Sequence, residues 1–280
     1  MHIYLYAVYI FMKIISFNIN GLRARLHQLQ ALIDAHSPDV IGLQEIKVYN
    51  AQFPVSDVEA MGYHVVYHGQ KAHYGVAMLT KVAPTNVQYG LPTDTEEHQK
   101  RLIAVTLPAA NGKDITVYNE YFPQGENISH EIKFPYKVAF YRDLTAHLQA
   151  SHSCEEQYIV MGDINISPSD LDIGIGPENA KRWLRSGKCS FQPLEREMLA
   201  TLQDLGLHDT FRHLHPDLTD RYSWFDYRSK GFVDNRGLRI DVIMASTALL
   251  PFCTESEIDY ELRGIEKPSD HAPIFASFAC

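Results

Sequence analysis

The sequence predicts an α/β domain in which two packed β-sheets carry helices on their outer faces. Apolar, β-branched runs alternate along the chain with longer segments whose apolar residues recur at helical spacing. Each half of the chain offers a strand that ends in a polar residue, then a helix, then another strand. No glycine-rich GxGxxG sequence follows a predicted strand, so a doubly wound dinucleotide-binding sheet fits less well.

The first part of this pattern is a strand, a helix and a second strand, over residues 13–18, 22–35 and 39–45. The first strand ends at Asn18 and the second at Glu45. Asn20 is the predicted cap of the helix, and Pro38 follows the end of that helix. A strand, helix and strand of this length predict a right-handed βαβ unit with parallel strands.

Further strands are predicted over residues 63–67, 74–79, 101–107, 114–121, 158–163, 239–245 and 272–278. Helices are predicted over residues 134–151, 177–186 and 194–205. The strands at 63–67 and 74–79 are expected to be antiparallel, since they are short runs separated only by residues 68–71. Between the strands at 101–107 and 114–121, Asn111-Gly112 is a strong turn signal, although the loop is longer than two residues. No repeat, low-complexity run or linker divides the chain, and we therefore expect one catalytic domain over residues 12–280.

Residues 1–11 are almost entirely apolar and aromatic. This run is too short to span a bilayer, which needs about 20 residues. It also lacks the basic start and small-residue cleavage site of a secretory signal. We interpret it as an N-terminal extension that precedes a functional start at Met12. The alternative is an additional edge strand or a segment that touches a membrane.

The composition, with 45% hydrophobic and 21% charged residues among 280, is that of an ordinary globular protein. A net charge of −9 argues against a protein that coats nucleic acid non-specifically. It is compatible with a nucleic-acid enzyme that combines clustered carboxylates with a local basic patch. The four cysteines have no metal-binding spacing, and they favour a reduced, cytoplasmic protein over a disulfide scaffold. Nothing in the sequence requires more than a monomer.

Polar side chains interrupt or end several runs that otherwise resemble buried strands: Asn18, Glu45, Tyr121, Asp163, Asn165, Asp241, Asp270 and His271. Converging carboxylates without basic partners repel one another and lose hydration. A divalent cation relieves that cost, and oxygen ligands without cysteine suit Mg²⁺ or Mn²⁺ rather than zinc. The sequence therefore predicts a metal site, and no organic cofactor is expected.

Roles follow from the chemistry of each side chain. Glu45 is the first candidate for metal ligation, and Asp241 would fix the tautomer of His271. Asp163 would then hold or deprotonate a water molecule. Asn18 and Asn165 supply donors for a charged oxygen, and Tyr121 either donates to the same oxygen or supports the leaving group.

Each of these residues also has an ordinary structural explanation. A single acid or amide at the end of a strand is usually a turn residue or a helix cap, and an Asp–His pair usually lies on the surface. Asp241 is the hardest to explain in this way, because it interrupts a run too apolar for an idle charge. The set as a whole therefore supports a catalytic site more strongly than any member does.

Six motifs occur in order along the chain: KIISFNINGLRAR at 13–25, IGLQEIK at 41–47, YFPQG at 121–125, VMGDINISP at 160–168, LRID at 238–241 and KPSDHAP at 267–273. Together with DLDIGIG at 170–176 and RYSWFDYR at 221–228, they resemble the exonuclease III family of AP endonucleases, within the endonuclease/exonuclease/phosphatase superfamily. The resemblance implies a four-layer α/β sandwich and a divalent-metal DNA phosphodiesterase of base-excision repair. It also implies 3′–5′ exonuclease, AP endonuclease and 3′-end-cleaning activities on duplex DNA, especially at abasic sites, nicks and blocked 3′ ends.

Carried over by motif, the metal ligands are Glu45, Asn18, Asp163, Asn165, Asp270 and His271. By the same resemblance, Asp163 matches the water-activating acid, Asn165 the phosphate donor and Tyr121 the tyrosine at the scissile phosphate. Asp241 and His271 match the paired acid and imidazole, and either Asp163 or His271 remains a candidate for the base. One departure is Glu120, which replaces a small residue and is expected to point away from the Tyr121 face of its strand.

The segment 221–239 mixes basic and aromatic residues, as a loop that faces DNA requires. We expect Trp224 and Phe225 to fill the gap left by a missing base. From composition alone, it is an equally good explanation that both side chains pack beneath a loop. The predicted DNA-binding residues are Arg23, Arg25, Lys47, Lys71, Gln124, Lys133, Lys188, Trp224, Phe225, Arg228 and Lys230.

Two other functions remain open at the level of sequence. A phosphoesterase of the same superfamily that acts on lipid or inositol phosphates would share the catalytic residues. A non-enzymatic DNA-binding protein or scaffold would be expected to lose at least one of four residues, and all four are present: Glu45, Asp163, Asp241 and His271.

Overall fold

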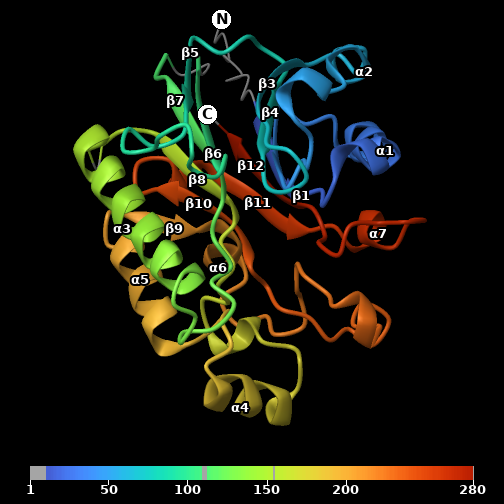
Figure 1. Cartoon of the computed structure of the whole chain (residues 1–280). Coiled ribbons are helices and arrows are strands. Elements are labelled where there is room, and N and C mark those ends of the chain that lie inside the picture. Colours follow the sequence, from blue (N-terminus) through green and yellow to red (C-terminus); the bar gives the residue numbers. More distant parts are fainter. Residues whose placement is uncertain (1–10, 109–111, 154, 280) are drawn as a thin grey trace, which may run out of the picture.

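Two six-stranded β-sheets pack face to face in the computed structural model, which describes residues 11–108, 112–153 and 155–279 (Figure 1). The strands of the first sheet are β1 (Phe11–Asn18), β2 (Val40–Gln44), β3 (His64–His68), β4 (Val76–Thr80), β11 (Cys253–Ile258) and β12 (Ile274–Ala279). The strands of the second sheet are β5 (Asn86–Tyr89), β6 (Leu102–Leu107), β7 (Ile115–Tyr121), β8 (Tyr158–Asp163), β9 (Leu207–Asp209) and β10 (Asp241–Ser246). The order is β11-β12-β1-β2-β4-β3 in one sheet and β5-β6-β7-β8-β10-β9 in the other.

Both sheets are mixed and are built on the same plan. In each, a central parallel pair is flanked by antiparallel strands: β1 with β2 in the first sheet and β7 with β8 in the second. The predicted βαβ unit is confirmed, because the helix after β1 returns the chain to a parallel neighbour. This internal symmetry brings the carboxyl ends of both parallel pairs to one edge of the molecule.

Helices cover the outer faces of the two sheets. The helices of the described residues are α1 (Leu26–His36), α2 (Val55–Glu59), α3 (Lys133–Ser151), α4 (Pro177–Ser186), α5 (Pro193–Gln203), α6 (Thr210–Leu214) and α7 (Tyr260–Arg263). Two of them do not cover an outer face: α4 packs on Phe191, Leu238 and Ile240, and Phe211 of α6 belongs to the core between the sheets. One apolar core lies between the sheets, a second between the first sheet and α1, and a third between the second sheet and helices α3 and α5. The predicted four-layer sandwich is therefore confirmed, with α3 and α5 side by side on the second sheet (Figure 1).

Several details differ from the sequence-based expectations. The first helix begins at Leu26 rather than at residue 22, because Leu22–Ala24 forms a separate 3-10 turn. Asn20 is not its cap, since the amide of Asn20 donates to Asp270 instead. Three strands with weak local signals were not predicted: β5, β9 and β11. The predicted turn at Asn111 lies outside the described residues.

The predicted N-terminal extension, residues 1–11, includes one residue of the first strand. Phe11 already belongs to β1 and pairs with Ala279, and Met12 pairs with Phe278. The other residues assigned to the extension, 1–10, lie outside the described part of the chain. Within that part, no helix is both long and apolar enough to cross a membrane.

Candidate active site

The register of the second sheet aligns three of the predicted site residues in one row. Asp163, at the end of β8, is paired with Tyr121 on the parallel strand β7 and with Asp241 on the antiparallel strand β10. In the first sheet Asn18 is opposite Gln44, so Glu45 follows at the same edge. Sheet pairing therefore gathers side chains that are more than 200 residues apart in the sequence.

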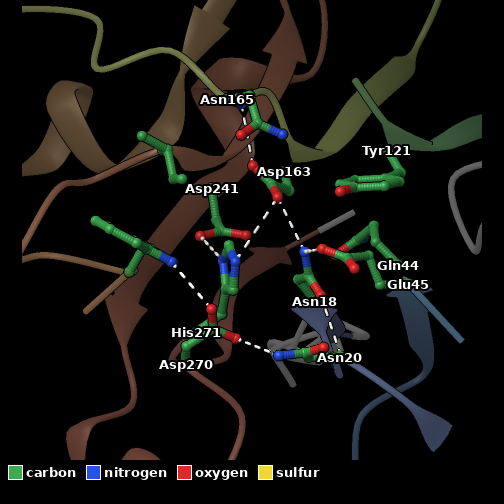
Figure 2. A network of polar contacts seen from close by, with 12 residues as sticks. Asn18, Asn20, Gln44, Glu45, Tyr121, Asp163, Asn165, Asp241, Asp270 and His271 are labelled. Atoms are coloured by element: carbon green, nitrogen blue, oxygen red, sulfur yellow. Dashed lines mark hydrogen bonds and ion pairs between the residues drawn. The ribbon is translucent and has the colours of Figure 1, made fainter. Parts of the chain in front are cut away.

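Asn18 connects the two sheets at this edge. Its side-chain amide donates one hydrogen bond to Glu45 Oε1 at 3.0 Å and another to Asp163 Oδ2 at 2.9 Å (Figure 2). Asn18 is completely buried. Both hydrogens of one amide are thus committed to two carboxylates, which fixes the separation of these acids.

His271 lies between two acids of the second sheet. Its Nδ1 is 2.9 Å from Asp241 Oδ2, and its Nε2 is 3.8 Å from Asp163 Oδ2 (Figure 2). The Asp241 contact fixes the orientation of the ring and places a hydrogen on Nδ1, so Nε2 faces the centre of the site. The predicted pairing of Asp241 with His271 is present in the structure.

Burial and the local charges displace the pKa values of this pair. Burial alone would lower the pKa of His271, but Asp241, Asp163 and Asp270 together raise it to about 10. Burial raises the pKa of Asp163 to about 8, with Asp241 and Glu45 adding to the shift and His271 opposing it. Burial is the main cause of the Asp163 shift and opposes the His271 shift, while the excess of carboxylates over positive charges raises both pKa values.

A cation fits at the centre of this site. One ligand atom from each of Glu45, Asp163 and His271 lies within 4.8 Å of the other two. The set is rich in carboxylate oxygen, which suits a hard divalent ion, and a cation would favour the ionised form of Asp163. Burial raises the pKa of Glu45, but Lys47 and Asn18 outweigh it and hold that pKa below its usual value. Glu45 is therefore ready as an anionic ligand.

Asp270 precedes His271 in the chain, and its carboxylate is held by donors from two other residues. Its carboxylate accepts from the Asn20 amide at 2.7 Å and from the Trp224 indole at 3.1 Å. Burial raises the pKa of Asp270, but His271 and these two donors lower it below its usual value. Asp270 therefore stands outside the group of three possible ligands and contributes negative charge beside His271.

Tyr121 and Asn165 flank Asp163 (Figure 2). Burial and the carboxylates of Glu45 and Asp163 raise the pKa of Tyr121 well above its usual value, so its phenol stays protonated and can donate. Asn165 has a left-handed backbone with φ 53°, and its backbone N–H donates to Asp163 Oδ1 at 3.0 Å. One hydrogen of its side-chain amide bonds the carbonyl of Phe122 at 3.0 Å. The other remains available to a substrate oxygen.

Most predicted DNA contacts lie on the surface. Side chains of this group are exposed: Arg23, Lys71, Gln124, Lys133, Lys188, Arg228 and Lys230. Arg25 and Lys47 are partly buried instead. Arg25 donates to the backbone carbonyl of Asn20, and Lys47 forms an ion pair with Glu45 at 2.8 Å. Lys47 therefore lies in the catalytic pocket itself.

The two aromatic candidates differ from each other. Trp224 is partly exposed and lies beside His271 through a backbone bridge, so it lines the site. Phe225 is 0% exposed and packs against Tyr222, Phe232 and Tyr260. The prediction that Phe225 enters DNA is corrected by this burial, because the ring already belongs to an aromatic core beneath the loop.

Sequence reasoning missed several residues that support the site. Arg101 is buried between the rings of Tyr74 and Tyr121, 4.4 and 4.6 Å from their centroids, and donates to the carbonyl of Tyr121 at 2.7 Å. Lys137 and Glu195 form a buried ion pair behind Asn165. The signal for Lys137 was present, since it falls on the apolar face of α3 together with Phe134, Phe140, Tyr141 and Leu144.

Comparison with known proteins identifies related nucleases. The sequence matches the Endonuclease/Exonuclease/phosphatase family over residues 15–271. It is 58% identical to exodeoxyribonuclease III of Haemophilus influenzae over 267 residues, which cover 95% of this chain and 100% of that relative. A solved 3′ phosphatase from Neisseria, bound to a product DNA hairpin, gives a TM-score of 0.85 at 36% identity and covers 95% of this chain and 99% of its own. An AP endonuclease from Archaeoglobus fulgidus gives 0.86 at 33% identity, with coverages of 96% and 100%.

Proposed function

The chain belongs to the endonuclease/exonuclease/phosphatase family, and we propose that it hydrolyses phosphodiester bonds of duplex DNA in base-excision repair. It is an enzyme of the exodeoxyribonuclease III type that combines 3′–5′ exonuclease, AP endonuclease and 3′-end-cleaning activities. The observation that carries this function is the convergence of Glu45, Asp163 and His271 at the joined edges of the two sheets. Abasic sites, nicks and blocked 3′ ends are the proposed targets.

We propose Mg²⁺ as the metal, with Mn²⁺ as a substitute. Glu45 and Asp163 would hold it, with His271 beside it and Asn18 fixing the spacing of the two acids. When bound, this ion supplies positive charge to the scissile phosphate and to the 3′-oxygen that leaves. The donor set of carboxylate oxygens supports a hard cation over zinc.

The protein groups act on the same phosphate from several sides. We propose that Asn165 donates its free amide hydrogen to a phosphate oxygen, and that the Tyr121 phenol donates beside it. His271, held by Asp241, presents Nε2–H to the phosphate as a third donor. These donors are fixed before substrate arrives, so their dipoles need little rearrangement in the transition state.

We propose that Asp163 rather than His271 takes the proton from the attacking water. Asp241, Asp163 and Asp270 raise the pKa of His271, which favours its protonated form, and the contact with Asp241 directs Nε2 toward the phosphate as a donor. Asp163 is a base when its carboxylate is ionised, and positive charge in the pocket favours that form. The backbone N–H of Asn165 holds Asp163 Oδ1, and the Asn18 amide holds Oδ2, which also faces His271 Nε2, so the carboxylate is fixed in orientation.

One assay tests this function against the alternatives. Purified protein is given an abasic-site duplex, a recessed 3′ end, a 3′-phosphorylated nick and an inositol phosphate, each with Mg²⁺ and with EDTA. We expect cleavage of all three DNA substrates with Mg²⁺ and none with EDTA. Turnover of the inositol phosphate with intact DNA would favour a different phosphoesterase, and DNA binding without turnover would favour a non-catalytic binder.

We further propose that the chain from Phe11 onward acts as one catalytic domain, as a monomer and in the cytoplasm. All the proposed catalytic side chains come from one chain, and the thiols of Cys189 and Cys253 are free and buried. Removal of residues 1–10 should leave the cleavage rate unchanged, while a cut that also removes Phe11 loses a strand pairing. Light scattering of the active protein with and without duplex would test the monomer.

A further inference from the structure

We propose that the buried ion pair Lys137–Glu195 is a positioning device that fixes the Asn165 turn against the scissile phosphate. Lys137 lies on α3 and Glu195 on α5, and both side chains are 0% exposed. The Lys137 ammonium is 2.5 Å from Glu195 Oε1. This inference rests on the proposed function, because it gives the pair a part in the same DNA-cleaving site.

A buried ion pair of this kind is poorly explained by stability. Removing two charges from water is costly, and proteins with apolar replacements for a buried ion pair are often equally stable or more stable. The pair interrupts the apolar face of α3, between Phe134 and Phe140. An apolar side chain would extend the third core at that position, so a positional role is a better explanation than an energetic one.

The other two N–H groups of the Lys137 ammonium donate to backbone carbonyls of the catalytic loops. Its ammonium bonds the backbone carbonyl of Asn165 at 3.0 Å and that of Gln124 at 3.4 Å. With the Glu195 contact, all three hydrogens of the ammonium are used. One side chain thus joins the turn after β8 to the turn after β7.

A second residue of α3 holds the neighbouring carbonyl of the same turn. Tyr141, one helical turn beyond Lys137, donates its hydroxyl to the carbonyl of Ile164 at 2.8 Å. The consecutive carbonyls of Ile164 and Asn165 are therefore both bonded to one rigid helix. This restraint supports the left-handed backbone of Asn165, which a residue other than glycine adopts at a cost.

Glu195 extends the support to a third loop. Its Oε2 accepts from the backbone N–H groups of Ser190 and Gln192, each at 2.8 Å. These bonds cap α5 and fix the segment that follows Lys188, a predicted DNA contact. The ion pair therefore lies where the three loops on the DNA-facing side of the second sheet meet.

The position of Asn165 matters because its amide is directed at a reacting phosphate. Displacement of a catalytic group by about 1 Å can cost about 100-fold in rate. Loss of the pair should reduce the cleavage step and leave DNA affinity nearly unchanged, because most predicted DNA contacts lie elsewhere on the surface. A loss of cleavage rate without a loss of DNA affinity distinguishes a positioning role from general unfolding, which would reduce both.

The test uses the double variant Lys137→Met/Glu195→Gln in the full chain. Methionine fills the volume of lysine without a charge, and glutamine retains an acceptor for the N–H groups of Ser190 and Gln192. We expect the single-turnover rate on an abasic duplex to fall about 10- to 100-fold, with the DNA dissociation constant changed less than threefold. Hydrogen exchange, measured without metal or DNA, should become faster at the backbone N–H groups of residues 164–167.

Leu148→Ala is the matched control for stability. It removes a buried side chain from the same helix without touching the Asn165 turn, and should lower the melting temperature while the cleavage rate at low temperature stays unchanged. A folded double variant with the wild-type rate and wild-type exchange overturns the proposal. An equal loss of rate in Leu148→Ala also overturns it, because the effect would then be one of stability.

Two further measurements cover the cases in which the double variant does not fold or the wild-type protein does not cleave DNA. If the double variant does not fold, Glu195→Gln alone breaks the ion pair with less disturbance, and an unchanged rate and exchange in that variant reject the proposal. If wild-type protein shows no metal-dependent cleavage of any DNA substrate, the proposed function fails. Hydrogen exchange at residues 164–167 then still reports whether the Lys137–Glu195 pair holds the turn.

Discussion

Two clusters of buried charge lie close together at the second sheet, and they differ in how their charges are balanced. The active-site cluster consists of Glu45, Asp163, Asp241, Asp270, His271 and Lys47. The arginine cluster consists of Asp172, Asp209, Arg212 and Arg239. Four acids share one lysine and one histidine in the first, whereas two acids meet two arginines in the second.

Arg239 illustrates the second arrangement. Its guanidinium bonds Asp172 Oδ1 and Asp209 Oδ2, both at 2.6 Å, and Arg212 bonds Asp172 as well. Burial raises the pKa of Asp172, but the two arginines outweigh it and hold that pKa below its usual value. The cluster is neutral and closed, so it has no position for an added cation.

Asp163 illustrates the first arrangement. Its pKa rises to about 8, in the opposite direction to that of Asp172, although both acids are buried. The difference lies in the supply of positive charge and not in the depth of burial. Buried acids therefore indicate a metal site where positive charge is short, and a structural network where it is sufficient.

Removal of divalent ions should produce the largest effect. EDTA should reduce cleavage of an abasic duplex to the background rate, because the active-site cluster then lacks the charge that its acids require. In Glu45→Ala, the Mg²⁺ concentration for half-maximal rate should rise at least about tenfold. Titration of the cleavage rate with Mg²⁺ measures both. Undiminished cleavage in EDTA would remove the distinction between the clusters.

Asp163→Asn should lower the single-turnover rate about 10³-fold, equivalent to about 4 kcal/mol of activation free energy. Its melting temperature without metal should stay nearly the same, since burial already raises the pKa of Asp163 and so favours the neutral carboxyl that asparagine replaces. DNA binding should remain close to that of the wild type. Full activity in this variant would reject Asp163 as the base, and a large loss of stability would show that its cluster is structural.

Arg239→Met should act in the opposite way. Asp209 would lose its arginine partner, and Asp172 would keep only Arg212. Leaving buried acids unpaired in this way costs about 3–5 kcal/mol in free energy of unfolding. Urea denaturation measures the loss. Arg236→Met is the matched control, because Arg236 forms an exposed pair with Asp234, and should change stability by less than about 1 kcal/mol. Equal effects of the two variants would contradict the assigned role of the arginine cluster.

Glu120→Gln should produce the smallest effect, seen in the pH dependence of stability. Glu120 is 0% exposed, neither carboxyl oxygen has a hydrogen-bond partner among the described residues, and burial raises its pKa well above the usual value of 4.5. The folded state thus holds this proton more tightly than the unfolded state, and the stability that it contributes is lost as pH rises above 4.5. Glutamine removes that loss.

Relative to wild type, Glu120→Gln should therefore become progressively more stable as the pH rises above 4.5. The cleavage rate should stay near that of the wild type. Glu120 shares the outer side of β7 with Tyr118, a member of the third core, and influences the pKa of Tyr141 on α3. Parallel pH profiles of stability for the two proteins would show that Glu120 is not protonated in the folded state.

Local patterns were sufficient for much of the fold. The limits of β8 and α4 agree with the sequence-based expectation, because an apolar β-branched run and a Pro-to-Gly helical segment carry their own boundaries. The strand β11 was missed, since its exposed residues obscure the alternation. Asn20 was assigned to a helix cap because its residue type suits both a cap and a site, and the sequence offers no way to choose.

The sequence by itself determined which acids, amides and histidine interrupt otherwise apolar strands, and from them the class of chemistry. Tertiary structure decided which of these groups meet, through the pairing of Asp163 with Tyr121 and Asp241 and the bridge from Asn18. It also decided that Phe225 is core and that Lys137 is buried behind Asn165. The physical reason is that burial and charge balance depend on neighbours distant in the chain, whereas strand and helix periodicity depends on neighbours within a few residues.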